Sequence, residues 1–416
     1  MIHMRLKYDT YFALIFKTIA ACYFLVSFTY FFFFNAGGGG DESLFVNDLL
    51  LIKSQGWIAA IEKSISIPYM LLAYPFSFFL EEYMALRLAS LLITFLLLVY
   101  FFKIAKIRNS TFYFYFLFYA ATSSFFFSGT NDICFFSGLI VFFAEVFYFI
   151  ENKRWNHQIL AFSGLVLSFF TRELFVVYLP VIVLAFYFLY KKGHLFLTAK
   201  MIFPALLFVV FLVLNGPSLL KNHQLSYDDK APPKEMNVTW SQRQYLAQLM
   251  VNKGELPNFK HPSWKVTQDY LKQNGADALP KTTLKSLTFD YQLTITEFFK
   301  DLYYSLFFGF RQLGLILFVI FYLWAMEVKK GRILNAAMFV PIATFIMLSL
   351  FSLIIISFIE LRWLIAVFTT SILFYDAYQA QNKINRFVIL ANYCILICFS
   401  MYGLYKLLPK LTAALI

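Results

Sequence analysis

Long apolar runs separated by short polar segments occupy most of the chain. Runs of close to 20 apolar residues recur from one terminus to the other, and a helix of about 20 residues crosses a ~30 Å hydrocarbon core. Because lipid offers no partners for backbone N–H and C=O groups, these runs are expected to be helical. The pattern predicts an all-α polytopic membrane protein with about eleven transmembrane helices. The expected spans are 11–34, 83–102, 111–128, 132–149, two short spans within 158–190, 195–214, 302–325, 334–358, 363–380 and 387–408.

The stretch 158–190 contains charged residues at its centre. Its length is too great for one span and small for two, and Thr171-Arg172-Glu173 interrupts it midway. An Arg–Glu pair inside one continuous membrane helix is costly. We therefore expect two short spans that turn at these residues on the outer side.

The segment 35–82, after the first span, reads as a first outer loop with interfacial helices. Two amphipathic stretches lie at 44–52 and 57–67, and a third, apolar stretch lies at 68–79. A helix of about 12 residues is only about 18 Å long and cannot cross the core. These stretches are expected to lie along the outer leaflet.

Charge sets the expected orientation of the spans. The 416 residues are 61% hydrophobic and 14% charged, against about 25% charged in soluble proteins. The net charge of +12 comes from basic residues in short loops between spans, as the positive-inside rule expects, so it does not indicate nucleic-acid binding. The N-terminus is expected in the cytoplasm.

Three regions follow from this topology. Residues 1–216 form the first transmembrane module, residues 217–300 form a long polar loop outside, and residues 301–416 form the C-terminal helices. We find no internal repeat and no interrupted span of the kind that transporters with inverted halves contain.

Charged residues gather at the predicted outer helix ends. A carboxylate there can take a proton from an attacking hydroxyl, and arginine can hold a phosphate leaving group through two parallel hydrogen bonds. This combination suits a reaction on a lipid-linked anionic substrate. The residues are Asp41, Glu42, Arg87, Asp132, Arg172, Glu173, Arg311, Glu360 and Arg362, with His223 in the long outer loop where an acceptor can reach it.

The ordered set of these segments resembles the GT-C superfamily of integral-membrane glycosyltransferases, which use polyprenyl-phosphate-linked sugars. "GGGGDESLF" after the first span is similar to the acidic dyad of that superfamily. "IPYMLLAYPFSFFLEEYMALRLASLLITFLLLVYFFK" is similar to its juxtamembrane helix and the span that follows. "SGTNDICFFSGLIVFF" resembles the second outer loop, and "LSFFTRELFVVYLP" and "IELRWLIAVF" resemble Arg-containing turns.

The resemblance implies an inverting transfer of a hexose or pentose from a polyprenyl-phosphate carrier. Asp41 would activate the acceptor hydroxyl, with Glu42 as the second catalytic acid of the dyad. The other residues named above would bind substrate. The partners would be the lipid-linked donor, membrane lipids, and a glycan, lipid or protein acceptor for a cell-envelope glycan. The membrane would be the bacterial inner (plasma) membrane or the endoplasmic reticulum membrane.

Several alternatives remain open at this point. Asp132 can simply begin its helix beside Asn131, Arg172 and Glu173 can form a structural ion pair, and single arginines can reach toward headgroups. The sequence indicates no cofactor and no metal site, and it leaves divalent-metal dependence open. Two other functions are an oligosaccharide ligase or polymerase acting on diphosphate-linked glycans, and a lipid-linked sugar transporter or flippase.

Overall fold

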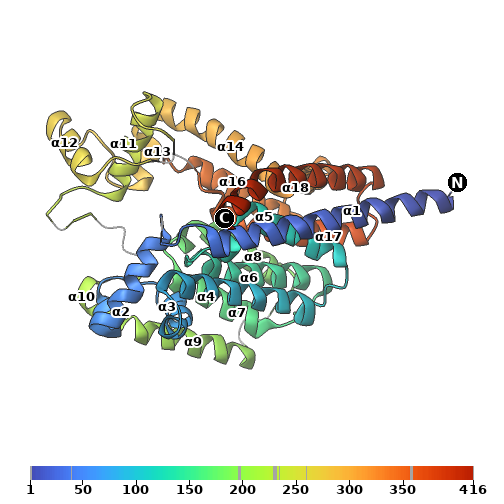
Figure 1. The fold of residues 1–416 in the computed structure, drawn as a ribbon, viewed down its shortest axis with the longest axis horizontal. Coiled ribbons are helices and arrows are strands. Elements are labelled where there is room, and N and C mark those ends of the chain that lie inside the picture. Colours follow the sequence, from blue (N-terminus) through green and yellow to red (C-terminus); the bar gives the residue numbers. More distant parts are fainter. Residues whose placement is uncertain are drawn as a thin grey trace. The chain divides into compact units, whose positions relative to one another are not determined.

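The fold consists of helices throughout the described part of the chain. The computed structural model describes residues 2–38, 40–194, 198–227, 232–233, 235–258, 260–356 and 359–415, with side chains from Thr10 onward. Within these ranges every regular element is a helix, and none is a strand. The prediction of an all-α protein is confirmed (Figure 1).

The chain divides into two compact units. The first comprises residues 1–228, 310–344 and 364–416, and the second comprises 229–309 and 345–363. The helices of the first unit are α1 (Ile2–Thr29), α2 (Glu42–Glu62), α3 (Ile67–Ala73), α4 (Glu82–Val99), α5 (Ser110–Ser123), α6 (Asp132–Asn152), α7 (Gln158–Thr171), α8 (Phe175–Lys191), α9 (Ile202–Leu214), α10 (Gly216–Asn222), α15 (Ile316–Lys329), α17 (Ile365–Ala380) and α18 (Arg386–Leu415). The second unit holds α11 (Trp240–Asn252), α12 (Trp264–Asn274) and α13 (Thr283–Phe289), while α14 (Tyr291–Leu313) and α16 (Phe339–Leu353) contribute to both.

Six of the described helical segments are long and apolar enough to cross a membrane, or up to eight if each of two bent pairs is one span. The six are Thr10–Phe34, Glu42–Glu62, Glu82–Ile104, Asp132–Asn152, Ala336–Leu353 and Arg386–Leu415. The helices α5, α7 and α8 are shorter, with 14, 14 and 17 residues, and 14 residues span only about 21 Å. The apolar helices indicate a membrane protein, but the described residues do not provide all of the about eleven expected spans as helices of membrane length.

The first outer loop follows the expectation in part. The stretches expected at 44–52 and 57–67 both fall within α2, where the non-helical Gly56 (φ 82°, ψ 169°) separates two helical segments across a kink. The third stretch forms α3 and the short 3₁₀ segment Tyr74–Phe78. The sequence therefore placed the boundary between these two stretches correctly, because a glycine with a positive φ interrupts the helix between them.

The span expected at 302–325 is wrong as a continuous helix. The chain is helical from Tyr291, breaks at Gly314 (φ 61°) and resumes as α15, with a sharp bend between the two helices. The amide of Leu315 donates to Asn392 Oδ1 on α18 at 2.7 Å. This hydrogen bond satisfies a backbone N–H group that loses its intrahelical acceptor at the break. The expectation of no interrupted helix is therefore also wrong.

The stretch 158–190 follows the prediction. Helix α7 ends at Thr171, Arg172 has extended dihedral angles (φ −155°, ψ 138°), and α8 begins at Phe175. Two helices therefore meet at the charged residues, as the cost of burying these charges in one span suggested.

Helix α6 is the centre of the first unit. It is almost entirely buried and packs against α4, α7, α8 and α17. A Cβ atom at Gly138 would lie 2.2 Å from the Gly164 carbonyl oxygen, so only paired glycines allow α6 and α7 to approach this closely. Small residues are the usual means of close helix packing in membranes.

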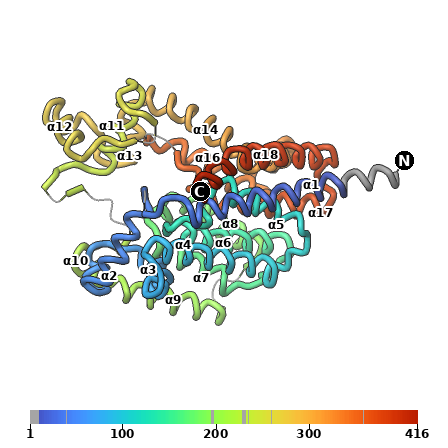
Figure 2. Tube along the Cα trace, viewed as in Figure 1, coloured from blue at the N-terminus to red at the C-terminus, as the bar shows by residue number. Residues whose placement is uncertain are grey.

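The first and last helices lie side by side and run parallel (Figures 1 and 2). Phe16 stacks on Tyr393, and the backbone at Gly403 faces the Tyr23 ring, so the contacts advance together along both helices. Two parallel spans begin on the same side of a membrane.

The second unit has a small core of its own. Tyr245, Leu246, Leu271, Leu279 and Ile355 are buried together. One carboxylate of this unit is also well paired, because Glu297 accepts hydrogen bonds from Gln248, Asn252 and Lys300.

Orientation in the membrane is the first testable expectation. In a cysteine-free background, Ser43→Cys and Lys221→Cys should react with an impermeant thiol reagent from outside, whereas Gly331→Cys should not. Lys221 and Gly331 are both exposed in the structure, so their difference reports sidedness rather than burial. Labelling of Gly331→Cys but not of Ser43→Cys from outside would invert the topology.

Candidate functional site

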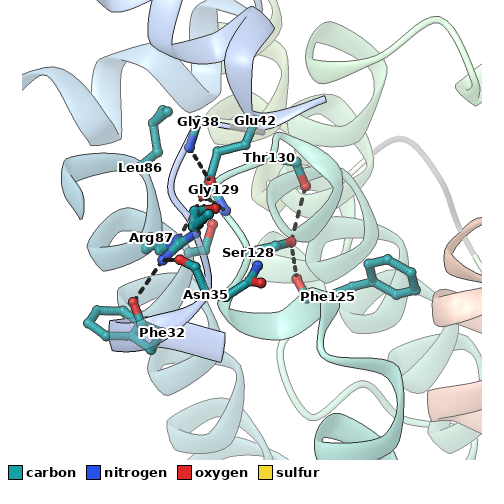
Figure 3. Close-up of polar contacts among 12 residues, drawn as sticks. Phe32, Asn35, Gly38, Glu42, Leu86, Arg87, Phe125, Ser128, Gly129 and Thr130 are labelled. Atoms are coloured by element: carbon teal, nitrogen blue, oxygen red, sulfur yellow. Dashed lines mark hydrogen bonds and ion pairs between the residues drawn. The ribbon is translucent and has the colours of Figure 1, made fainter. Parts of the chain in front are cut away.

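Arg87 joins the start of α4 to the end of the first helix. It is 2% exposed, and its Nη1 donates to the carbonyl oxygens of Phe32 at 2.9 Å and Asn35 at 3.1 Å (Figure 3). Its Nε and Nη2 donate to the two oxygens of Glu42 at 2.8 and 2.9 Å, and Nη2 also reaches the Ala36 carbonyl oxygen at 3.5 Å. All five N–H groups of this guanidinium are thereby engaged within the chain. In this arrangement Arg87 fixes the backbone and has no donor left for a phosphate.

Glu42, the first residue of α2, accepts hydrogen bonds from three separate segments. Besides Arg87, the amide of Gly38 donates to its Oε2 at 2.9 Å, and the amide of Gly129 donates to its Oε1 at 3.0 Å (Figure 3). The carboxylate is buried, at 7% exposed. Four donors occupy its lone pairs, so a substrate hydroxyl would have to displace one of them. This geometry favours Glu42 as an anchor of the loop over Glu42 as a second catalytic acid.

Asp41 lies directly before this anchor and is partly exposed. The glycines around it serve two purposes. Gly38 and Gly40 have φ of +69° and +60°, which residues with a Cβ rarely adopt. A Cβ at Gly37 would lie 2.3 Å from the Tyr83 ring. The run of glycines therefore allows a tight turn that presents Asp41 beside the buried Glu42–Arg87 pair; its remaining member, Gly39, lies outside the described residues.

Asp132 and Arg172 form a second buried ion pair at the same end of the first unit. Asp132 is the first residue of α6, and Arg172 follows the last residue of α7. Their side chains are 1% and 7% exposed. The Thr130 hydroxyl donates to Asp132 Oδ2 at 3.1 Å. The adjacent Glu173 is exposed, whereas Arg172 pairs with a carboxylate at the start of another helix.

Backbone carbonyls hold the Arg172 turn in place. The Thr171 carbonyl oxygen accepts hydrogen bonds from Asn131 Nδ2 at 3.2 Å and from the Ser66 hydroxyl at 2.8 Å. Sequence reasoning missed these residues, and it also missed Gly129 and Thr130. The only available signal was the polar run "SGTND" between two apolar stretches, from which Asp132 alone was selected.

The start of the long loop is tied to this end of the unit as well. The Ser226 amide donates to Asn215 Oδ1 at 2.7 Å, and its hydroxyl donates to the Ile65 carbonyl oxygen at 2.7 Å. The Tyr227 hydroxyl donates to the Phe169 carbonyl oxygen at 2.9 Å. Burial, together with the charge of Glu173, raises the pKa of Tyr227 to about 12, so this hydroxyl remains a hydrogen-bond donor at neutral pH.

Two further candidate residues, His223 and Arg311, also belong to the first unit. His223 is exposed at the end of α10, which packs on α2 near Glu62, at the opposite end of α2 from Glu42. Arg311 lies within electrostatic range of Tyr23 on α1.

Glu360 and Arg362 belong to the second unit, where they form an ion pair with each other. No group of three or more His, Cys, Asp or Glu residues able to hold a metal ion occurs in the described parts of the chain.

The geometry thus defines an all-α, multi-helix membrane protein in which two buried Arg–carboxylate pairs meet at one end of the first unit. No protein-family model, curated protein or solved structure matches the chain. The candidate site must therefore be judged on its own chemistry.

Proposed function

We propose that the protein is an inverting glycosyltransferase of the GT-C type, working at the outer or lumenal face of the membrane. The observation that carries this proposal is the convergence of Asp41 with two buried arginine–carboxylate pairs at one end of the helical unit. Its donor would be a sugar linked to a polyprenyl phosphate, and its acceptor a glycan, lipid or protein. A bacterial plasma membrane is the favoured location, and the endoplasmic reticulum membrane is the alternative.

The proposed reaction assigns different work to each group. Asp41 takes the proton of the acceptor hydroxyl while the oxygen of that hydroxyl attacks the anomeric carbon of the sugar. The bond between that carbon and the phosphate oxygen breaks on the opposite side, and the polyprenyl phosphate leaves with the electron pair. In this proposal Arg172 contacts the phosphate while it remains paired with Asp132. Arg87 and Glu42 hold the loop that carries Asp41.

The direct test uses purified protein in detergent or nanodiscs. It is offered undecaprenyl phosphate carrying glucose, galactose, mannose or arabinose, together with crude envelope glycans and lipids as acceptors. The proposal expects release of undecaprenyl phosphate that depends on the acceptor and on an intact Asp41. A wild-type protein that releases none from any donor, while remaining folded, would contradict it.

A lipid-linked sugar transporter is the second candidate, and one observation favours it. The break at Gly314 places an interrupted helix in the chain, and interrupted helices line the substrate sites of many transporters. A transporter would move the labelled donor between leaflets of a liposome without any acceptor and without releasing undecaprenyl phosphate. The transferase needs the acceptor and cleaves the donor. A ligase acting on diphosphate-linked glycans would instead release the diphosphate carrier.

A further inference from the structure

The short segment 128–132 contacts both buried ion pairs. The Gly129 amide donates to Glu42 Oε1 at 3.0 Å (Figure 3). The Thr130 hydroxyl donates to Asp132 Oδ2 at 3.1 Å. A chain advances at most about 3.6 Å per residue, so the Cα atoms of Gly129 and Asp132 lie within about 11 Å. One rigid turn therefore lies between the loop that carries Asp41 and the pair that contains Arg172.

Glycine is required at position 129 for space. A Cβ atom there would lie 2.4 Å from Glu42 Oε1 and 2.9 Å from Leu86 Cβ. Figure 3 shows Gly129 facing the Glu42 carboxylate, with Leu86 alongside. Its φ is not in the left-handed region, so backbone conformation does not explain the residue. The missing side chain leaves the gap into which the Glu42 carboxylate fits.

We propose that Gly129 is a positioning residue that couples the Asp41 loop to the Asp132–Arg172 pair through the Glu42 carboxylate. The inference rests on the proposed function, because the coupled groups are the expected base and the expected phosphate ligand. Gly129 touches no substrate. It acts only through Glu42 and through the turn that it begins.

The buried environment makes this coupling stiff. The side chains of Glu42 and Arg87 are 8% and 2% exposed, and those of Asp132 and Arg172 are 1% and 7% exposed. Hydrogen bonds between charges are stronger at the low dielectric of such a site, and an unpaired member is costly. A displacement of one ion pair is therefore expected to displace the turn and the other ion pair as well. Misplacement of reacting groups by about 1 Å can cost about 10²-fold in rate.

The test compares Gly129→Ala with the matched control Gly216→Ala. A Cβ at Gly216 meets nothing within 4 Å, and its φ is not in the left-handed region. Hydrogen–deuterium exchange of the full chain is measured for peptides that cover residues 35–45. Exchange there should be at least about tenfold faster in Gly129→Ala, the equivalent of one lost hydrogen bond to a charged group. Gly216→Ala should leave it unchanged.

A second variant and a kinetic measurement separate positioning from stability. Arg87→Lys keeps the charge but cannot donate to Glu42 and to the Phe32 and Asn35 carbonyls at once. It should also speed exchange in 35–45, and it serves in place of Gly129→Ala if that protein does not fold. The kinetic measurement uses the most active of the sugar donors named under Proposed function. In both Gly129→Ala and Arg87→Lys, kcat should fall about 10²-fold while the KM for the donor is unchanged.

Each result bears on the coupling. Unchanged exchange in 35–45 and unchanged kcat in a folded Gly129→Ala protein would overturn it, as would a lower melting temperature with no effect on either measurement. If the wild type transfers no sugar, the proposed function fails, and the exchange measurement still decides whether the turn holds the loop.

Discussion

Asp41→Asn is expected to lower the turnover number by about 10²–10⁴-fold, the usual contribution of general acid–base catalysis. The asparagine retains the shape of the side chain but cannot accept the proton of the acceptor hydroxyl. Because Asp41 is partly exposed and lies outside the buried Glu42–Arg87 pair, folding should be preserved. The measurement is undecaprenyl phosphate release, with the melting temperature of the detergent-solubilised protein recorded in parallel.

Two variants sharpen the assignment of the base. Asp48→Asn changes a partly exposed aspartate farther along α2 and should keep near wild-type turnover. Glu42→Gln should act differently, because it leaves the buried Arg87 guanidinium without a charged partner and should lower stability. Normal turnover in Asp41→Asn would show that Asp41 is not the catalytic base. An equal decrease in turnover in Asp48→Asn would show that any loss of a negative charge on or near α2 lowers activity.

Arg172→Ala is expected to destabilise the protein by about 3–5 kcal/mol, because it leaves the Asp132 carboxylate buried without its partner. Activity loss in this variant would therefore be ambiguous by itself. The melting temperature and the donor dependence of the rate are measured together, at low and at saturating donor concentration.

The double variant Asp132→Asn/Arg172→Met resolves the ambiguity. Removing both charges and keeping similar volume is often nearly neutral for stability, so this protein should be more stable than Arg172→Ala. If Arg172 holds the donor phosphate, donor use should stay about 10- to 150-fold weaker, the equivalent of about 1.5–3 kcal/mol for a hydrogen bond to a charged group. A stable double variant with full activity at low donor concentration would make the Asp132–Arg172 pair purely structural.

Helix ends were predictable where local chemistry marks them. The Thr171-Arg172-Glu173 interruption correctly predicted the break between α7 and α8, because charge within an apolar run is costly whatever surrounds it. The break at Gly314 was missed. A single glycine within an apolar run is a weak signal, and the bend there depends on Asn392 of a distant helix.

Partners of the charged residues were not predictable in the same way. Arg172 has an adjacent carboxylate in sequence, yet it pairs with Asp132, because both lie at buried helix ends while Glu173 is exposed. Asp41 and Glu42, which the sequence analysis groups as one catalytic dyad, differ in their burial. The structure buries Glu42 against Arg87 and leaves Asp41 at the edge.

The amino-acid sequence by itself determined the class of this protein, because apolar runs of membrane length leave helices as the only way to pair the backbone. It also supplied glycine at positions 38 and 40, where the backbone has a positive φ that residues with a Cβ rarely adopt. Only the tertiary structure decided which carboxylate anchors the loop, which carboxylate each buried arginine pairs with and which glycine leaves space for a carboxylate. Those outcomes depend on atoms that are distant in sequence and are placed within 3 Å by helix packing.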